Sequence, residues 1–533
     1  MALANPVALS TPVPRPASRV TAAEWRWLGV VAGILLALTI PPLLIAATQA
    51  SQNEVFPGYV VIARDAYVYQ ALWHAGAAGS WLFQSHYTSE ALPGVLLYPY
   101  YLWSGHLVGA LPASWTYHVT RLIAGGALSI AVYALTAELY RPVILRRWAF
   151  VIAALGGGVG LLLPSIAIGP LSVRATESLS PGSSVADLVA MAPHLATAMA
   201  LLCAVLVAGL RLRRGTSWPA VGGGLFAILA LQLIYPQLAL LAGAILAAWA
   251  GLRRLPGPFA FAVAAALIQL PYDVYLVSTM RSHPLALAAV RSALDVGDPL
   301  GFLVVSHLMT TILIVVGLVT RRLRGDLILP ALWILGMTAF MFTPGINALL
   351  GRSFMASSIP FALCAVPGLL ALLRRLRTRP WRRRALAATV AVAGFYGLFS
   401  LAQPVWIAAQ RLDAHAEYEN RDESRLLARL APRLSSRDLV LTTYFDGLFV
   451  PAQTNARVYD GHPEMTIDAA RKSTEALAFF TSWPAERRDR FLLANRIDYV
   501  LSTSLEHTAR LESDPGLRVI DREGAAVLFG AIP

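Results

Sequence analysis

The stretch WLGVVAGILLALTIPPLLIAA, residues 27–47, carries no charged side chain. A bilayer core of about 30 Å needs roughly 20 apolar residues, because each helical residue advances the chain by about 1.5 Å. The stretch follows a leader rich in proline and arginine, and no clear small-residue cleavage site ends it. It is therefore predicted to be a retained membrane anchor, with residues 1–26 as a cytoplasmic leader.

The rest of the chain has the same apolar character. Of its 533 residues, 57% are apolar and only 14% are charged, whereas an average soluble domain has about 25% charged residues. This composition excludes a disordered protein and argues against a soluble enzyme. Both cysteines lie in apolar runs, which favours neither a disulfide framework nor a cysteine zinc site. A polytopic, mainly α-helical membrane protein is the class that fits.

The net charge of +13 is unevenly distributed. Up to Pro404 there are 27 arginines against 11 acidic residues, and the remainder has 16 basic against 19 acidic residues, so the two parts carry +16 and −3. The arginines recur in clusters at 141–147, 211–214, 253–254, 321–324 and 374–384. Positively charged loops stay in the cytoplasm, so each cluster is assigned to the inner side. The charge then indicates topology and not nucleic-acid binding.

Eleven spans fit between these inner clusters. They are 27–48, 117–139, 148–168, 188–210, 219–234, 237–252, 258–277, 300–320, 328–345, 353–373 and 385–405. The two spans on either side of Tyr235 are short and could instead form a re-entrant loop, which would leave the number of crossings odd. With the N-terminus in the cytoplasm, the odd number places the C-terminal end outside. On this map 21 of the 27 arginines lie inside.

A long outer segment, residues 49–116, separates the first two spans. It contains RDAYVYQALWHAG (64–76), in which Asp65, Tyr69 and Trp73 are four residues apart and share one helical face. A carboxylate beside aromatic rings suits a sugar, because sugar hydroxyls need an acceptor and sugar C–H faces pack on rings. The aromatic-rich stretch 92–112 is expected to lie along the outer membrane interface.

This order of elements resembles the GT-C superfamily of integral-membrane glycosyltransferases, which includes protein O-mannosyltransferases and the lipid A aminoarabinose transferase. In those proteins the first span is followed by an outer loop with an early catalytic carboxylate. An interfacial helix with a P-x-L-x-Y-like pattern and a span opening near R-L come next. The matching positions here are Asp65 with Tyr69, residues 93–101, and Arg121 with Leu122. The resemblance covers the first 150 residues and continues as a many-span plan to about residue 405.

The resemblance implies an inverting glycosyltransferase of the bacterial cytoplasmic membrane. It would move a sugar from a polyprenyl-phosphate donor to an extracytoplasmic lipid, glycan or protein acceptor. Asp65 would be the general base, and arginine forks on the outer side would hold the donor phosphate. The arginine candidates are Arg352, Arg121 and Arg291. Asp65 lacks the tandem acidic partner of several members, so the need for a divalent metal stays open.

Other residues are candidates for substrate contacts. Besides Tyr69 and Trp73, they are the acids Glu177 and Asp273, with Asp187, Asp295 and Asp298 as further second acids, and the pair His462 and Glu464. The segment GHPEMT (461–466) resembles a G-H-x-x-E-T-like segment in the outer domains of some bacterial GT-C-like proteins. Each candidate also has a plain structural explanation. Asp65 could cap a helix, and Tyr69 and Trp73 could be aromatic anchors at the membrane interface. The acids could be solvated loop residues, and the arginines could contact lipid headgroups. His462 and Glu464 could belong to a turn that precedes a helix.

The composition becomes that of a soluble protein after Pro404, and residues 406–533 are predicted to form a small extracytoplasmic α/β domain. The expected strands are 438–444, 456–461 and 498–504, the helices 467–480 and 484–496, and a final hairpin covers 517–531. Residues 27–405 form the transmembrane domain. The alternative function is that of a non-catalytic flippase for a lipid-linked glycan, or a membrane scaffold whose outer domain binds a partner.

Overall fold

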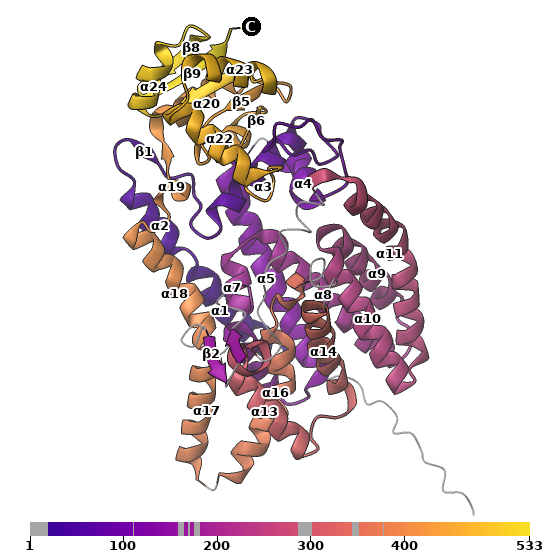
Figure 1. Ribbon diagram of the computed structural model, residues 1–533. Helices are drawn as coiled ribbons and strands as arrows, with labels where there is room; N and C mark the ends of the chain where they lie inside the picture. The colour runs from indigo at the N-terminus through magenta and orange to yellow at the C-terminus, as the bar shows by residue number, and fades with distance from the viewer. Residues whose placement is uncertain are drawn as a thin grey trace, which may run out of the picture.

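The computed structural model describes residues 20–109, 111–157, 165–168, 171–174, 182–285, 301–343, 351–376 and 378–532. A long helical bundle carries a small sheet domain at one end, and the C-terminus lies in that domain (Figure 1). The expected class, a mainly α membrane protein with a C-terminal α/β domain, is confirmed.

Helices account for nearly all of the bundle. They are α1 (Ala22–Ala37), α2 (Pro41–Gln49), α5 (Ala113–Leu139), α6 (Val143–Leu155), α7 (Val185–Ala190), α8 (Pro193–Leu212), α9 (Trp218–Ile234), α10 (Pro236–Arg253), α11 (Pro256–Ser282), η2 (Gly301–Ser306), α13 (Leu308–Val319), η3 (Gly325–Leu327), α14 (Ile328–Phe342), η4 (Gly351–Phe354), α16 (Ser358–Arg375), α17 (Arg379–Ala393) and α18 (Phe395–Gln410). A short hairpin, β2 (Ser165–Ile168) and β3 (Leu171–Arg174), lies beside them.

Seven helical segments within the described ranges are long and apolar enough to cross a membrane, or eight if the pair α17 and α18, bent by 49°, is one span. Two more apolar helices, α9 and α13, are shorter. The expected count of eleven is not confirmed. The predicted span 148–168 is interrupted because α6 ends at Leu155, and the next residues include Gly157, whose φ of +141° lies outside the helical region. The predicted span 300–320 is divided at His307 between η2 and α13.

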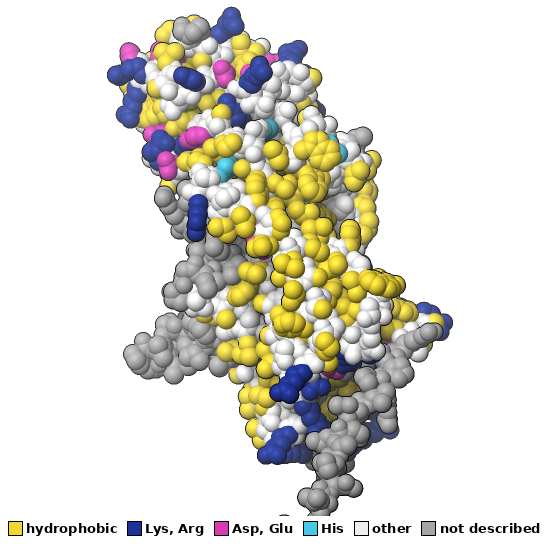
Figure 2. Space-filling model, turned by 90° about the vertical axis from the view of Figure 1, so that its right-hand side faces the viewer, with side chains coloured by type: hydrophobic (Ala, Val, Ile, Leu, Met, Phe, Trp, Pro, Cys, Tyr) yellow, Lys and Arg dark blue, Asp and Glu magenta, His cyan; other side chains and the backbone are white. Residues whose placement is uncertain are grey.

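The surface of the bundle is that of a multi-pass membrane protein. Figure 2 shows hydrophobic side chains over the middle of the molecule and Lys and Arg side chains gathered at the end away from the C-terminal domain. Inside the bundle, helices approach closely where small residues meet. Gly368 of α16 packs on the backbone of Leu313 in α13, where an added Cβ would lie 1.8 Å from the carbonyl oxygen.

The C-terminal domain is built on a five-stranded sheet with the order β6-β5-β7-β9-β8. Its strands are β5 (Leu439–Leu441), β6 (Arg457–Val458), β7 (Tyr499–Ser502), β8 (Leu517–Glu523) and β9 (Ala526–Ala531), and its helices are α19 (Ala414–Glu417), α20 (Arg421–Leu430), α21 (Asp446–Gln453), α22 (Ala469–Thr481), α23 (Ala485–Asn495) and α24 (Leu505–Glu512). β5 pairs parallel with β6 and β7, whereas β9 pairs antiparallel with β7 and β8. The predicted strands, the two predicted helices and the final hairpin are all present.

The outer segment 49–116 packs on the C-terminal domain as well as on the bundle. It contains β1 (Glu54–Val55), α3 (Ala63–Ala77) and α4 (Pro99–Val108), and β1 pairs antiparallel with β4 (Glu419–Asn420). One apolar core joins side chains from both parts, among them Tyr67, Tyr87, Leu448 and Phe449. Figure 1 shows α3 at the junction between the bundle and the sheet domain, and α21 of the sheet domain packs against it. Residues more than 300 positions apart therefore meet at this junction.

Candidate active site

Asp65 lies in the first turn of α3, where a carboxylate is favoured by the positive end of the helix dipole. The residue before the helix is Ile62, with a left-handed φ of 52° and no side-chain hydrogen bond. The interpretation of Asp65 as the helix cap is therefore wrong, because Asp65 is the third helical residue. Its side chain is 44% exposed, so the carboxylate is accessible while one of its oxygens is held by a protein partner.

That partner is His462, which lies 397 residues further along the chain. Its Nε2 is 2.9 Å from Asp65 Oδ1, and its side chain is only 6% exposed. The backbone N–H of Glu464 points at the other ring nitrogen, Nδ1, at 3.3 Å. An N–H group can only donate, so Nδ1 is the acceptor and the ring proton belongs on Nε2. His462 then donates to Asp65 Oδ1, and no hydrogen bond recorded for the described residues engages Oδ2.

The loop that carries His462 is fastened to the outer segment at several points. Ser85 Oγ donates to the carbonyl of Met465 at 2.8 Å, and Thr466 Oγ1 donates to the carbonyl of Tyr87 at 2.5 Å. At Gly461 an added Cβ would lie 2.8 Å from both the Gly447 carbonyl oxygen and the Tyr87 ring, so this close approach needs glycine. The interpretation of 461–466 as a simple turn is too limited, because the turn joins the two parts of the site.

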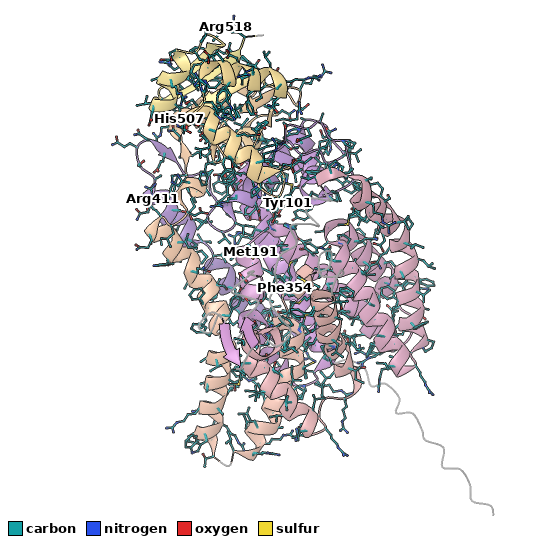
Figure 3. All side chains as sticks on the ribbon, viewed as in Figure 1. Tyr101, Met191, Phe354, Arg411, His507 and Arg518 are labelled. Atoms are coloured by element: carbon teal, nitrogen blue, oxygen red, sulfur yellow. The ribbon has the colours of Figure 1, made fainter. Side chains whose placement is uncertain are left out.

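Aromatic rings form the side of the site that faces the bundle. Tyr69 stacks on Tyr101 with ring centroids 4.2 Å apart and planes 13° apart, and Trp73 meets Tyr101 edge-on at 5.4 Å. The Tyr101 hydroxyl is 2.7 Å from Nδ1 of His194, at the start of α8. Figure 3 shows Tyr101 below α22 and above Met191 and Phe354, where the outer parts meet the bundle. Tyr69 and Trp73, which were predicted to share one helical face, thus both contact the ring of Tyr101.

Sequence reasoning did not identify the contact between Asp65 and His462. Each residue was a candidate by itself, but no local spacing links positions so far apart. The ring of His194 lies among those of Tyr69, Tyr100, Tyr101 and Tyr235, so this histidine packs inside the aromatic group.

Arg121, proposed for the donor phosphate, is enclosed in the bundle with 2% of its surface exposed. Its Nη1 donates to Thr39 Oγ1 and to the carbonyl of Val189, both at 2.8 Å, and Nε lies 3.3 Å from His118. A cavity of about 20 Å³ beside it has room for one water molecule, since one water needs about 10–15 Å³. Contact with lipid headgroups at the surface, the alternative for Arg121, is wrong because the guanidinium is buried.

The other candidates are scattered or not described. Asp273 lies on α11 and accepts a hydrogen bond from Gln232 Nε2 at 3.1 Å. Asp187 is buried in α7 and accepts from the Tyr396 hydroxyl at 2.5 Å, so it is not the solvated loop acid that was expected. Arg352 belongs to η4, but its side chain is outside the described part of the structure. Arg291, Glu177, Asp295 and Asp298 also lie outside the described residues.

The described residues around Asp65 supply one carboxylate and one imidazole that face each other. Within the described residues no group of three or more His, Cys, Asp or Glu side chains comes together in a way that could hold an ion. Asp65 and His462 use their facing atoms, Oδ1 and Nε2, for a hydrogen bond to each other.

Among solved structures of similar fold is the oligosaccharyltransferase of Archaeoglobus fulgidus in complex with Zn and sulfate. It is 12% identical with a TM-score of 0.47, and the match covers 88% of this chain and 67% of that protein. ArnT from Cupriavidus metallidurans bound to undecaprenyl phosphate is 13% identical with a TM-score of 0.49, covering 96% and 98%. Its apo structure has a TM-score of 0.46 at 13% identity, covering 95% and 98%. No protein-family model matches the sequence, and no curated protein matches it.

Proposed function

We propose that the protein transfers a sugar from a polyprenyl-phosphate donor to the hydroxyl of an extracytoplasmic acceptor, with inversion at the anomeric carbon. The observation that carries the proposal is the pairing of an accessible carboxylate, Asp65, with a buried histidine donor, His462, next to the rings of Tyr69 and Tyr101. A carboxylate needs both access to substrate and a fixed orientation to serve as a general base. The Asp65 carboxylate has both.

In this mechanism the acceptor hydroxyl donates to Asp65 Oδ2 while its oxygen faces the anomeric carbon. The new bond from acceptor oxygen to anomeric carbon forms as the bond from that carbon to the phosphate oxygen breaks. The hydroxyl proton moves to Asp65, and the polyprenyl phosphate leaves as an anion. His462 Nε2–H holds Oδ1 during this step, and the backbone N–H of Glu464 keeps the ring in the required tautomer.

The departing phosphate needs a cation on the outer side. Arg352 remains the proposed residue, because Arg121 is engaged with Thr39 and Val189 inside the bundle. Arg64, next to Asp65, forms an ion pair with Asp413 at 3.0 Å, so it is already neutralised in part.

The proposed orientation follows from the arginine distribution. The N-terminus lies in the cytoplasm, and the C-terminal domain and the Asp65 site lie on the outer face of the cytoplasmic membrane. Carrier-linked sugars are amphiphilic, so a site at the junction of an apolar bundle and a polar domain suits such a donor. The end of the bundle rich in Lys and Arg, away from the C-terminal domain, is the one expected in the cytoplasm (Figure 2).

The experiment is a transfer assay with radiolabelled polyprenyl-phosphate sugars and the full-length protein in nanodiscs. The panel of donors is tested against wild type, Asp65→Asn and a matched control, Asp413→Asn, which removes an exposed carboxylate of the neighbouring ion pair. We expect Asp65→Asn to lose transfer by about 100-fold or more, the usual contribution of a general base. Asp413→Asn should stay within a few-fold of wild type. Full activity in Asp65→Asn would exclude the assignment of Asp65.

A further inference from the structure

An open cleft with both polar and apolar lining lies between the outer segment and the C-terminal domain. Its volume is about 350 Å³, and it is open to solvent along its outer side. The outer segment and the start of α5 contribute one wall and the C-terminal domain the other, and the lining residues are Val55, Pro57, Gln70, His74, Ala113, Ser114, Glu419, Ser424, Ala428 and Gln453. None of these residues takes part in the contacts that hold Asp65.

The cleft uses a different face of α3 from the proposed catalytic site. Gln70 and His74 each follow by one residue Tyr69 and Trp73, and one residue turns a helix by about 100°. The rings of Tyr69 and Trp73 point to Tyr101, whereas Gln70 and His74 line the cleft. The single helix α3 therefore separates two sites.

The pairing of β1 with β4 builds the floor of the cleft. Val55 is the register partner of Glu419, so the strand contact brings the buried Glu419 side chain to the outer segment. Gln453 Nε2 donates to Glu419 Oε2 at 2.5 Å, and Ser424 also hydrogen-bonds this carboxylate. Burial raises the pKa of Glu419 to about 7, so its charge is partly lost at neutral pH.

The remaining hydrogen-bonding groups of the cleft are both donors and acceptors. Tyr59 donates its hydroxyl to Gln70 Oε1 at 3.3 Å, which leaves the Gln70 amide hydrogens for a ligand. Gln453 uses its amide hydrogens on Glu419, which leaves its carbonyl oxygen as an acceptor. Ser114 and His74 add a hydroxyl and an imidazole, and burial lowers the pKa of His74. A neutral imidazole is thereby favoured.

These features define the ligand by its chemistry. The lining contains no Lys or Arg, which disfavours an anion, and its one carboxylate is already hydrogen-bonded, which disfavours a metal ion. Mixed donors and acceptors match hydroxyl groups, while Val55, Pro57 and Ala113 can pack on C–H surfaces. From this combination we infer that the cleft is a binding site for a neutral saccharide, separate from the site at Asp65. A glycan seated there would contact both the outer segment and the C-terminal domain.

The test measures saccharide binding directly and does not require catalysis. Full-length protein in nanodiscs is titrated with maltose, lactose and N,N′-diacetylchitobiose, with trialanine as a peptide probe, and binding is followed by saturation-transfer difference NMR. Ala428→Trp fills the cleft from an exposed position of α20, and Ala470→Trp places the same ring at an exposed position of α22 outside the cleft. Gln70→Leu removes one lining amide without adding bulk.

We expect at least one saccharide to bind wild type, Ala470→Trp and Asp65→Asn alike. Ala428→Trp should abolish binding, and Gln70→Leu should weaken it about tenfold, the effect of one lost hydrogen bond. No saccharide binding, or binding unchanged by Ala428→Trp, would overturn the inference, as would binding of trialanine in place of the sugars. Because Asp65→Asn is part of the series, transfer retained in that variant would count against the catalytic proposal alone. Saccharide binding unchanged by Ala428→Trp would count against this inference alone.

Discussion

His462 offers the sharpest test of the proposed site, because it contacts Asp65 and needs no contact with substrate. Replacing it with alanine removes the Nε2–H that lies 2.9 Å from Asp65 Oδ1. The carboxylate would then lose its fixed orientation, although the base itself would remain. His462 is thus predicted to be a positioning residue for a base that acts through its other oxygen.

The size of the effect follows from the kind of hydrogen bond involved. A hydrogen bond to a charged group contributes about 1.5–3 kcal/mol, and about 1.4 kcal/mol corresponds to a tenfold change in rate. His462→Ala is therefore expected to lower kcat by roughly 10- to 150-fold, with a smaller change in KM. His462→Gln places an amide N–H near the position of Nε2, so it should recover much of the lost rate.

The assay compares kcat and KM of wild type, His462→Ala and His462→Gln in nanodiscs. Because His462 is almost fully buried, thermal unfolding of each variant serves as the control for folding. A purely structural role would lower the amount of folded protein without changing kcat per folded molecule. Equal kcat in wild type and His462→Ala, or no difference between the alanine and glutamine variants, would refute the reasoning.

Three further predictions concern stability and use the midpoint of thermal unfolding. Burial raises the pKa of Glu417 to about 7, and neither carboxylate oxygen has a hydrogen-bond partner among the described residues, so this group destabilises the fold increasingly as pH rises from about 4.5 to 7. Glu417→Gln should therefore raise the midpoint at pH 8, with a gain of up to about 3 kcal/mol in the free energy of unfolding, and leave the midpoint unchanged at pH 4. An unchanged midpoint at pH 8 would contradict this. Lys472 joins the C-terminal domain to the outer segment, because its Nζ lies 2.7 Å from the Glu90 carboxylate. Lys472→Met should lower the free energy of unfolding by about 1–3 kcal/mol, and adding Glu90→Gln should recover part of this loss. A double variant whose loss equals the sum of the two single losses would argue against the ion pair. In the bundle, Arg146 and Glu24 form an ion pair of 2.9 Å, and both side chains are about 1% exposed. Arg146→Met should lower the free energy of unfolding by about 3–5 kcal/mol, because it leaves the Glu24 charge buried and unpaired, and the double variant with Glu24→Gln should lose much less. Equal losses in the two variants would show that the unpaired charge is not the cause.

The sequence predicted the parts of this protein that depend on local patterns. The apolar run 27–47 lies within the first helical segment, Ala22–Gln49, and the alternation after Pro404 predicted the strands and helices of the C-terminal domain. These patterns are reliable because burial in a bilayer or against a sheet requires apolar residues at fixed spacings within one short segment of the chain. The number of spans was less predictable, because the glycines that follow Leu155 and the irregular turn at His307 interrupt apolar runs without making them less apolar.

The candidate site was only partly accessible to the same reasoning. Asp65, Tyr69 and Trp73 could be found together because four-residue spacing places side chains on one helical face. Two features required the tertiary structure, the contact of His462 with Asp65 and the enclosure of Arg121. Both depend on packing between segments that are distant in the chain, and the composition and residue spacing of each segment do not show which other segment it contacts.

By itself, then, the sequence determined that the chain is a multi-pass membrane protein with a small α/β domain and an outer carboxylate beside aromatic residues. Only the tertiary structure placed His462 against that carboxylate and formed the cleft beside Glu419. The physical reason is that the outer segment and the C-terminal domain share one core, and their strands β1 and β4 pair across more than 360 residues. The histidine beside Asp65 and the cleft beside Glu419 both arise from that long-range packing.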